Sequence, residues 1–396
     1  MTIRQIPRPR AWPMPADPAG RRKTRVSFVL HKFSRGGSDR VAAYLARGFA
    51  DAGMDVELII FSRGGEVESL LSGLLGTDVP VHCLGRAGPS RALDLMRGLS
   101  KLVRLLRVRE ADAVISTANN TALVTAIAVR LARVRKSRLV LKTTNPIATS
   151  RHKGLLRKFR RWTYQTIFRW TDAVWTLSAD ESAEMRGEFP DFAGLFRDVA
   201  NPYVTAAMLA GPGPGGSTRA GKTIVSVARL TAQKRLDRLI TAFAHVRTPG
   251  ARLLILGEGE EREALSALIK HLGLDERVSM PGYATDVSRA LHESDLFVLT
   301  SDYEGLPAAL LEAMATNCPV LSTDCFPAAR SLLGDVDGGG IIENVEPVAL
   351  AATLDQYLQR PRPTTLRAIA VGYSIENGVA SHLEALARCL ELERAP

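Results

Sequence analysis

The sequence predicts an α/β fold of two doubly wound parallel-sheet domains, and three observations lead to this prediction. Short apolar strands alternate with helical stretches along most of the 396 residues, which is typical of parallel sheets with helices on both faces. The alternation is interrupted by a glycine- and proline-rich run at 211–216. The charge is also uneven, because residues 1–200 carry 34 Lys and Arg against 18 Asp and Glu, and the remainder carries 18 against 23.

The first domain is expected at 25–205, after a basic, proline-rich tail at 1–24 that has little apolar periodicity. A helix is expected at 39–52, directly after the pair Gly36-Gly37. The predicted strands of this domain are short apolar runs at 26–30, 56–61, 113–116, 139–141 and 173–177.

The second domain is expected at 222–374, after a turn-rich linker at 206–221. Its predicted strands lie at 223–227, 253–256, 278–280, 296–300 and 320–322, and its helices at 236–246, 260–272, 287–292 and 308–315. The last segment, 375–396, begins with an amphipathic helix at 375–392 that no strand follows.

Composition excludes several classes of protein. With 46% hydrophobic and 23% charged residues and a mean hydropathy near zero, the chain is neither disordered nor a disulfide framework. No run reaches the roughly 18 apolar residues of a membrane-spanning helix. We expect no secretory signal, because the first 25 residues are rich in Pro and Arg and have no apolar h-region. Four scattered cysteines without a CxxC pair indicate a reduced, cytoplasmic protein. The basic first half predicts an anionic partner, which could be nucleic acid, phospholipid or a phosphorylated substrate.

The densest group of polar residues follows the predicted strand at 296–300. Pro307 stands where a first-turn proline belongs, so the amino end of the next helix opens at the carboxyl edge of the sheet and favours an anion. We interpret Glu304 and Glu312 as acceptors of hydrogen bonds from ligand hydroxyls, which suits a ligand with both phosphate and polyol. The alternative is that Glu304 caps the helix and Glu312 is a solvated surface acid.

A second group follows the predicted strand at 223–227. Arg229 and Lys234 emerge there at the same sheet edge, where they could hold phosphate; the alternative is that both are simply solvated. The paired glycines ending in Gly37 would let backbone approach a ligand closely. Gly257-Glu-Gly259 is interpreted as a tight turn, because the third glycine of a dinucleotide fingerprint is missing.

Taken in order, these motifs resemble retaining glycosyltransferases of family four, of the type that builds bacterial surface polysaccharides. The resemblance covers most of 25–392 and implies the GT-B fold, two Rossmann-like domains that face each other across a cleft. It rests on Gly36-Gly37, Ala228-Arg229-Leu with Lys234, Leu256-Gly-Glu-Gly259, Val278-Ser-Met-Pro-Gly282-Tyr283, and Glu304-x7-Glu312.

The resemblance also implies residue roles. Arg229 and Lys234 would bind the donor diphosphate, Glu312 the ribose and Glu304 the donor sugar, and Glu304, Arg229 and Lys234 are the expected catalytic residues. Gly37 would approach the phosphate from the other domain, and the helix at 375–392 would cross back to that domain. The remaining expected donor-binding residues are Tyr283, Gly305, Leu306, Pro307 and Ala308.

The chain departs from the family on the acceptor side. Many members have a histidine at a strand end there, whereas the candidate strand ends of this sequence offer Asn119 and Asn145. We expect no metal and no resident cofactor. Asp335-Val-Asp337 lies in a glycine-rich loop, and protein cations are expected to neutralise the leaving diphosphate.

The segment 151–170 is basic and has no acidic residue, and aromatic and leucine side chains are interleaved with its cations. Three interpretations stay open: a core helix with a solvated basic side, a helix on an anionic membrane surface, or a nucleic-acid face.

The sequence therefore predicts a glycosyltransferase that moves a sugar from a nucleotide-diphosphate donor, UDP before GDP, to a hydroxyl of a lipid-linked oligosaccharide. It would work in the cytoplasm or on the inner face of the cell membrane, and no nucleic-acid partner is expected. The alternatives are a nucleotide-sugar epimerase and a catalytically silent scaffold of the same fold.

Overall fold

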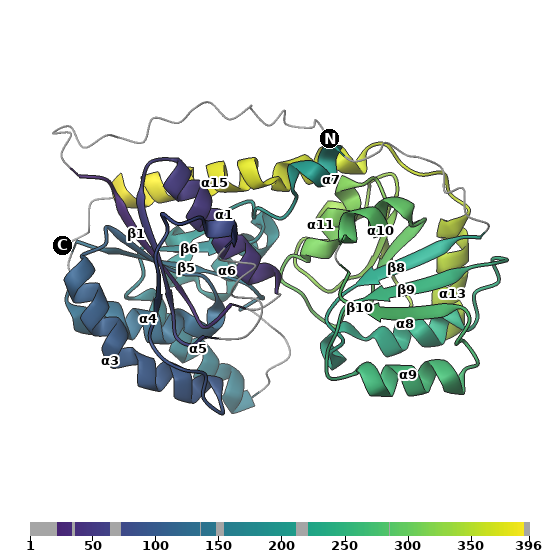
Figure 1. Cartoon of the computed structure of the whole chain (residues 1–396), viewed down its shortest axis with the longest axis horizontal. Coiled ribbons are helices and arrows are strands. Elements are labelled where there is room, and N and C mark those ends of the chain that lie inside the picture. Colours follow the sequence, from purple (N-terminus) through teal and green to yellow (C-terminus); the bar gives the residue numbers. More distant parts are fainter. Residues whose placement is uncertain are drawn as a thin grey trace. The chain divides into compact units, whose positions relative to one another are not determined.

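The computed structural model describes residues 22–33, 36–63, 73–134, 136–147, 154–210, 221–284 and 286–391. The chain divides into two compact units, the first made of Met1–Pro202 with Ile375–Pro396 and the second of Tyr203–Ser374. Each unit holds one parallel sheet with helices on its faces (Figure 1). The predicted α/β fold with two doubly wound sheets is confirmed.

The sheet of the first unit has seven strands in the order β3-β2-β1-β4-β5-β6-β7. The sequence predicts five of them to within a few residues, because they are apolar runs buried on both faces. The two edge strands, β3 and β7, were not predicted, because each has only three residues and little apolar character. The strands are β1 Arg25–Leu30, β2 Asp55–Ile60, β3 Val81–Cys83, β4 Ala113–Ser116, β5 Arg138–Lys142, β6 Ala173–Thr176 and β7 Phe196–Asp198.

Helices cover both faces of this sheet. On one face α3 (Arg91–Arg109), α4 (Asn119–Ala132) and α5 (Gly154–Phe168) lie side by side, and on the other α1 (Gly37–Asp51) packs against α15 (Ile375–Glu391) (Figure 1). A further helix, α6, spans Ala179–Glu188. Within the described chain, no helix is both long and apolar enough to cross a membrane.

Two glycines allow the last helix to pack closely on the first unit. A Cβ atom on Gly48 of α1 would lie 2.5 Å from the side chain of Val379, and one on Gly378 would lie 2.4 Å from the backbone of Pro202. Real Cβ contacts are not this short, so larger residues at either place would push α15 away. Small side chains at these two contacts therefore let α15 complete the first unit.

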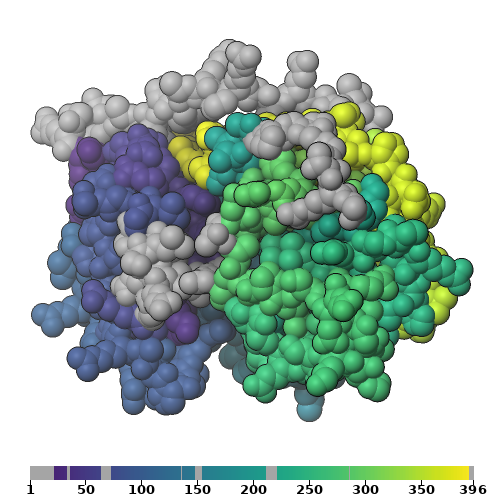
Figure 2. Space-filling view, turned by 45° about the vertical axis from the view of Figure 1, so that its right-hand side comes forward, coloured from purple at the N-terminus to yellow at the C-terminus, as the bar shows by residue number. Residues whose placement is uncertain are grey.

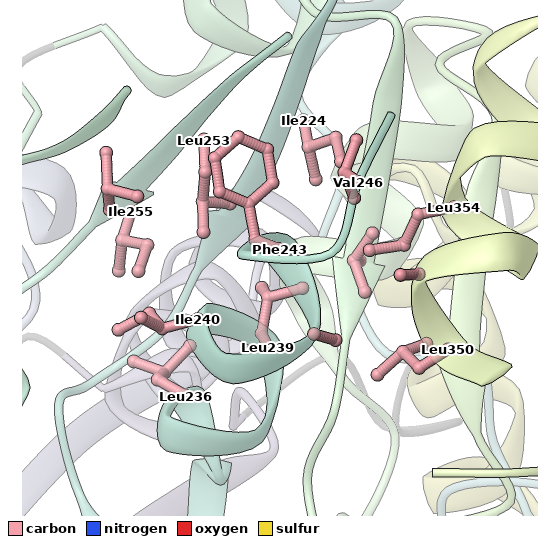
Figure 3. Packing of buried hydrophobic residues seen from close by; sticks show 14 of the residues in the cluster. Ile224, Leu236, Leu239, Ile240, Phe243, Val246, Leu253, Ile255, Leu350 and Leu354 are labelled. Atoms are coloured by element: carbon pink, nitrogen blue, oxygen red, sulfur yellow. The ribbon is translucent and has the colours of Figure 1, made fainter. Parts of the chain in front are cut away.

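The sheet of the second unit has six strands in the order β10-β9-β8-β11-β12-β13. Its core lies where α8 packs on the sheet and on α13, with Phe243 and Leu239 against Leu253 and Leu354 (Figure 3). The space-filling view shows the closely packed green and teal surface of this unit (Figure 2). The strands are β8 Thr223–Val227, β9 Arg252–Leu256, β10 Val278–Gly282, β11 Leu296–Leu299, β12 Val320–Thr323 and β13 Gly339–Ile342.

The last strand of this sheet was not predicted, because a run of glycines resembles a loop. In the fold these glycines make room for an aromatic ring: a Cβ on Gly340 would lie 2.0 Å from the hydroxyl of Tyr357, which donates a hydrogen bond to Gly339 O at 2.9 Å. The helices of the unit are α7 Ala206–Ala210, α8 Leu236–Phe243, α9 Arg262–His271, α10 Val287–Glu293, α11 Ala308–Ala315, α12 Ala329–Leu333, α13 Pro347–Leu358 and α14 Leu366–Ala370.

Parts of four predicted segments lie outside the described residues: 1–21 of the tail, 151–153 of the basic segment, 211–220 of the linker and 392–396 of the last segment. The predicted linker at 206–221 begins with the short helix α7. The division between the units falls at Pro202, three residues before the predicted end of the first domain at 205.

Candidate active site

The candidate site lies where the strand order of the second sheet reverses. β8 and β11 are neighbours, and from them the sheet grows in opposite directions through β9 and through β12. The loops that follow β8 and β11 therefore diverge at the carboxyl edge, which in doubly wound sheets is the place for a ligand. These are the loops at 228–235 and 300–307, the two that the sequence analysis singled out.

Hydrogen bonds join the two loops into one wall. Gln233 donates its side-chain amide to Tyr303 O at 2.7 Å, and its own carbonyl accepts from the Asp302 N–H at 3.0 Å. The Thr300 hydroxyl donates to Arg235 O at 3.0 Å. Because these bonds involve backbone atoms on both sides, the loops hold a fixed relation to each other.

Lys234 and Glu304 form an ion pair across these loops, with Lys234 Nζ bonded to Glu304 Oε1. Their side chains are only 15% and 9% exposed. The Ser301 hydroxyl donates to the same Oε1 at 2.6 Å, and the Glu304 N–H donates to Cys325 O at 2.7 Å. The interpretation of Glu304 as a helix cap is wrong, because the N-cap of α11 is Pro307 and no side chain caps that helix.

Arg229 differs from Lys234 in being exposed. Among the described residues its guanidinium makes no hydrogen bond or ion pair, so it is the cation of this edge that is available to an incoming anion. Its backbone is held on both sides, by the bond from Ala228 N to Leu256 O at 3.0 Å and the bond from Leu230 N to Glu258 O at 2.9 Å.

Two glycines of the loop after β9 create the close packing behind Arg229. A Cβ on Gly257, whose φ is +144°, would lie 1.9 Å from Ala228 O, and a Cβ on Gly259 would lie 2.2 Å from Leu230 O. The interpretation of this motif as a tight turn was incomplete. The glycines allow one loop to lie against the backbone of another, and this contact positions Arg229.

Helix α11 begins at Ala308, directly after the paired loops. Pro307 is its N-cap rather than its first helical residue, one position from the prediction. Glu312 lies inside the helix and is 3% exposed, so its interpretation as a solvated surface acid is wrong. Leu306 is buried and Gly305 lies beside it, whereas Tyr283 follows the edge strand β10 and is 48% exposed.

The first unit holds the donor-binding candidate Gly37 and the acceptor-side candidates Asn119 and Asn145. Gly37 is the first residue of α1, next to Gly36 as the N-cap. Asn119, the first residue of α4, joins two loops: its amide donates to Asn145 O at 2.7 Å, and its side-chain oxygen accepts from the Thr144 N–H at 2.9 Å. Asn119 therefore shapes the edge of the sheet, while the side chain of Asn145 is exposed.

The structure adds a histidine that the sequence analysis did not single out. His31 directly follows β1, and its Nε2 lies 3.2 Å from Asp94 Oδ2. Burial lowers the pKa of His31, although the hydrogen bond to Asp94 acts to raise it. Burial alone would raise the pKa of Asp94, but hydrogen bonds from the Gly88 N–H and from His31 outweigh burial and lower it. The strand ends at 113–116 and 139–141 offer only asparagines, whereas this histidine lies at the end of another strand, β1.

A buried lysine in the first unit was also not predicted. Lys142, the last residue of β5, is 3% exposed and donates to the side-chain oxygen of Asn201. Burial lowers its pKa to about 7, although the nearby Glu181 acts in the opposite direction. Burial raises the pKa of Glu181, and burial together with the positive Lys142 lowers that of His382 well below its ordinary value.

Over the residues that the structure describes, no group of three His, Cys, Asp or Glu side chains could hold a metal ion. Asp335 and Asp337 are both exposed.

Comparison with known protein families assigns the chain to a class. A model described as glycosyl transferase 4-like domain matches residues 36–194, and one described as glycosyl transferases group 1 matches residues 215–373. The two matches follow the two units and together span most of the chain. Both halves of the chain therefore match glycosyltransferase models, and the protein is a transferase enzyme.

Curated relatives agree with this class. An uncharacterised glycosyltransferase of Haemophilus influenzae is 25% identical over 84% of this chain and 90% of its own length. A Campylobacter jejuni enzyme is 38% identical over 31% of this chain and 33% of its own length. Its name is N-acetylgalactosamine-N,N'-diacetylbacillosaminyl-diphospho-undecaprenol 4-alpha-N-acetylgalactosaminyltransferase. Like it, several other relatives are matched over only about a third of their length.

Solved structures share the fold. HepE of Anabaena, solved in complex with UDP and glucose, has a TM-score of 0.69 at 19% identity and covers 92% of this chain and 94% of its own. WaaG, described as a glycosyltransferase involved in lipopolysaccharide biosynthesis, has a TM-score of 0.70 at 20% identity, covering 93% of this chain and 100% of its own. The predicted GT-B fold is confirmed.

Proposed function

We propose that this glycosyltransferase moves a sugar from a UDP-sugar to a hydroxyl of a lipid-linked oligosaccharide, with retention of anomeric configuration, in the synthesis of a cell-surface polysaccharide. The observation that carries the proposal is the position of Arg229. Its guanidinium is exposed, has no side-chain partner among the described residues, and lies where the strand order of the second sheet reverses. Arginine binds phosphate in a bidentate manner, so a nucleoside diphosphate suits this position.

The donor would be recognised by three parts of the second unit. Arg229 would bind the diphosphate, the amino end of α11 would offer free N–H groups to the same anion, and Glu312 would accept hydrogen bonds from the ribose. Lys234 would share its charge between the diphosphate and Glu304, to which it is already bonded. The complexes of HepE with UDP and with UDP-glucose support UDP over GDP.

The transfer itself needs neutralisation of the leaving diphosphate, because negative charge develops on it as the glycosidic bond breaks. Arg229 and Lys234 would supply this neutralisation without a metal ion. In a transfer on the front face of the sugar, a diphosphate oxygen accepts the proton of the acceptor hydroxyl. Glu304 would orient the donor sugar, since its second carboxylate oxygen is not committed to the pair with Lys234.

The acceptor is proposed from the relatives. The name of the Campylobacter jejuni enzyme contains a diphospho-undecaprenol acceptor, and other relatives are named for amylovoran, colanic acid and lipopolysaccharide core synthesis. A lipid-linked acceptor would bring this chain to the inner face of the cell membrane. An epimerase is less well supported, because it needs acid and base groups at the sugar, and the loops after β8 and β11 have no histidine.

The proposal is tested by incubating the protein with UDP-sugars and a lipid-diphosphate-linked sugar, in EDTA, and following UDP release. Turnover with one UDP-sugar is expected, and proton NMR of the product should show the anomeric configuration of the donor. Arg229→Ala should reduce kcat/KM by at least ~100-fold, about 2.7 kcal/mol of transition-state binding. Arg289→Ala, an exposed arginine on α10 paired with Glu293, is the matched control and should retain full activity.

Turnover with a GDP-sugar alone would contradict UDP as the nucleotide of the donor. A product with inverted anomeric configuration would contradict retention. The absence of turnover with any sugar nucleotide would favour a catalytically silent scaffold.

A further inference from the structure

We propose that helix α5 is a membrane-docking helix, and that a ridge of its side chains inserts between the headgroups of an anionic lipid bilayer. The ridge is made of Leu155, Phe159 and Trp162. These side chains are 84%, 64% and 60% exposed, and Leu156 beside them is 58% exposed. So many large apolar groups on one short helix mark an interaction surface rather than scattered surface residues.

The three ridge residues share one side of the helix. Their spacing of four and then three residues places them in a row along an α-helix, and the rings of Phe159 and Trp162 stack with their centroids 6.1 Å apart. The opposite side is the one that packs on the first unit, where Tyr164, Ile167 and Phe168 are buried. The ridge therefore points away from the core of its own unit.

The charge around the ridge is strongly positive. Helix α5 carries Arg157, Lys158, Arg160 and Arg161 and no acidic residue. The three helices α3, α4 and α5, which lie side by side on this face (Figure 1), carry eleven Lys and Arg and one acid. That acid, Asp94, is buried against His31. The outer layer of the first sheet thus presents positive charge that its own helices do not balance.

The cations of α5 differ in their partners, and Arg160 lies over the ring of Tyr164, 5.4 Å from its centroid. Arg157 and Arg161 bind the two carboxylate oxygens of Glu188 at 3.0 and 3.2 Å, which fastens the helix to α6. Lys158 is exposed and, among the described residues, makes no ion pair. At three positions after Leu155 it lies on the same side of the helix as the ridge, where its ammonium would meet a lipid phosphate.

Two features favour lipid over nucleic acid. Leu155 and Leu156 are aliphatic and have no ring for a base to stack on, whereas base stacking is what aromatic residues contribute to nucleic-acid faces. A helix with an apolar edge between cations matches the boundary between acyl chains and anionic headgroups. The proposal stands on side chains of the first unit and is independent of the donor and acceptor proposed above.

The experiment is co-sedimentation of the full chain with vesicles of phosphatidylcholine alone or with phosphatidylglycerol. We expect binding to the anionic vesicles, weak binding to the neutral ones, and a blue shift of tryptophan emission that Trp162→Phe removes. The variant Leu155→Ser/Phe159→Ser should lower the partition coefficient at least ~10-fold. The matched control is Val348→Ser on α13, 63% exposed in the second unit, which should bind as the wild type does.

Lys158→Gln tests the charge, and it should weaken binding to anionic vesicles about fivefold while leaving binding to neutral ones unchanged. Circular dichroism of each variant reports on its folding. The release of UDP from a UDP-sugar reports separately on its donor site. The proposal is overturned by a lack of binding to anionic vesicles or by ridge variants that bind like the wild type. Two further outcomes overturn the proposal while vesicle binding persists. In one, the ridge variants lose salt-sensitive binding to an oligonucleotide; in the other, they lose the ability to form a dimer.

Discussion

The contact between Gly257 and Ala228 offers a sharp test of how the second unit positions its cation. Replacing Gly257 with alanine places a methyl group 1.9 Å from Ala228 O, at a φ of +144° that L-residues rarely adopt. Backbone strain of this kind costs roughly 1–3 kcal/mol, and overpacking a filled space costs roughly 1–3 kcal/mol more. We therefore expect a loss of about 4 kcal/mol in the free energy of unfolding.

A matched substitution separates the two costs. Gly273 also has a positive φ, +64°, but a Cβ there would meet no atom within 4 Å. Gly273→Ala should therefore lose only about 1–2 kcal/mol, the ordinary cost of the left-handed conformation. Urea denaturation of the wild type and both variants measures these losses.

The functional consequence follows from the same contact. Because Ala228 must move to admit the methyl group, Arg229 moves with it, and the affinity of the folded Gly257→Ala variant for UDP should fall at least ~10-fold. The affinity of Gly273→Ala should stay within about twofold of the wild type. If the two variants lose equal stability and both bind UDP normally, the close packing does not position Arg229.

Two further predictions concern charged groups. Lys234→Met leaves the Glu304 carboxylate buried without its cation and should lower the free energy of unfolding by about 3–5 kcal/mol. Adding Glu304→Gln should recover most of this loss. An equal loss of stability in the single and the double variant would contradict the ion pair. Between pH 7 and 8.5 the unfolded chain keeps the proton of Lys142 that the folded chain gives up. The free energy of unfolding should therefore rise with pH, by up to about 1.4 kcal/mol per pH unit. The rise should be steeper in the wild type than in Lys142→Met. Identical slopes in the two proteins would refute the lowered pKa of Lys142. Above pH 9 the buried thiols of Cys318 and Cys325 reverse the trend, because burial raises their pKa values to about 12 and about 11 and only the unfolded chain ionises.

Local sequence signals were sufficient for most of the sheet framework. Runs such as those of β1 and β8 consist mostly of apolar residues, with one buried serine each, because both faces of the strand are buried. This predicts a strand without knowledge of the neighbours. The edge strands β3 and β7 and the glycine strand β13 lack that signal. For β13 the reason lies in a partner from another element, since Gly340 is required by Tyr357.

The candidate site was predictable in its place but not in its contacts. A cation after a buried strand must lie at the carboxyl edge of a parallel sheet, which places Arg229. The pairing of Lys234 with Glu304 joins residues 70 apart in the chain, and that of His31 with Asp94 joins residues 63 apart. Neither pair leaves a periodic signal in the sequence, so only the three-dimensional fold brings them together.

The most direct test of the account is the thermal unfolding of the wild type, Arg229→Ala and Arg289→Ala with and without UDP, in the absence of metal. At a UDP concentration of 100 times its Kd, the nucleotide should add ~2.7 kcal/mol to the stability of the wild type and of Arg289→Ala. Arg229→Ala should gain little. Equal stabilisation of all three proteins, or none of any, would contradict a diphosphate site built around Arg229.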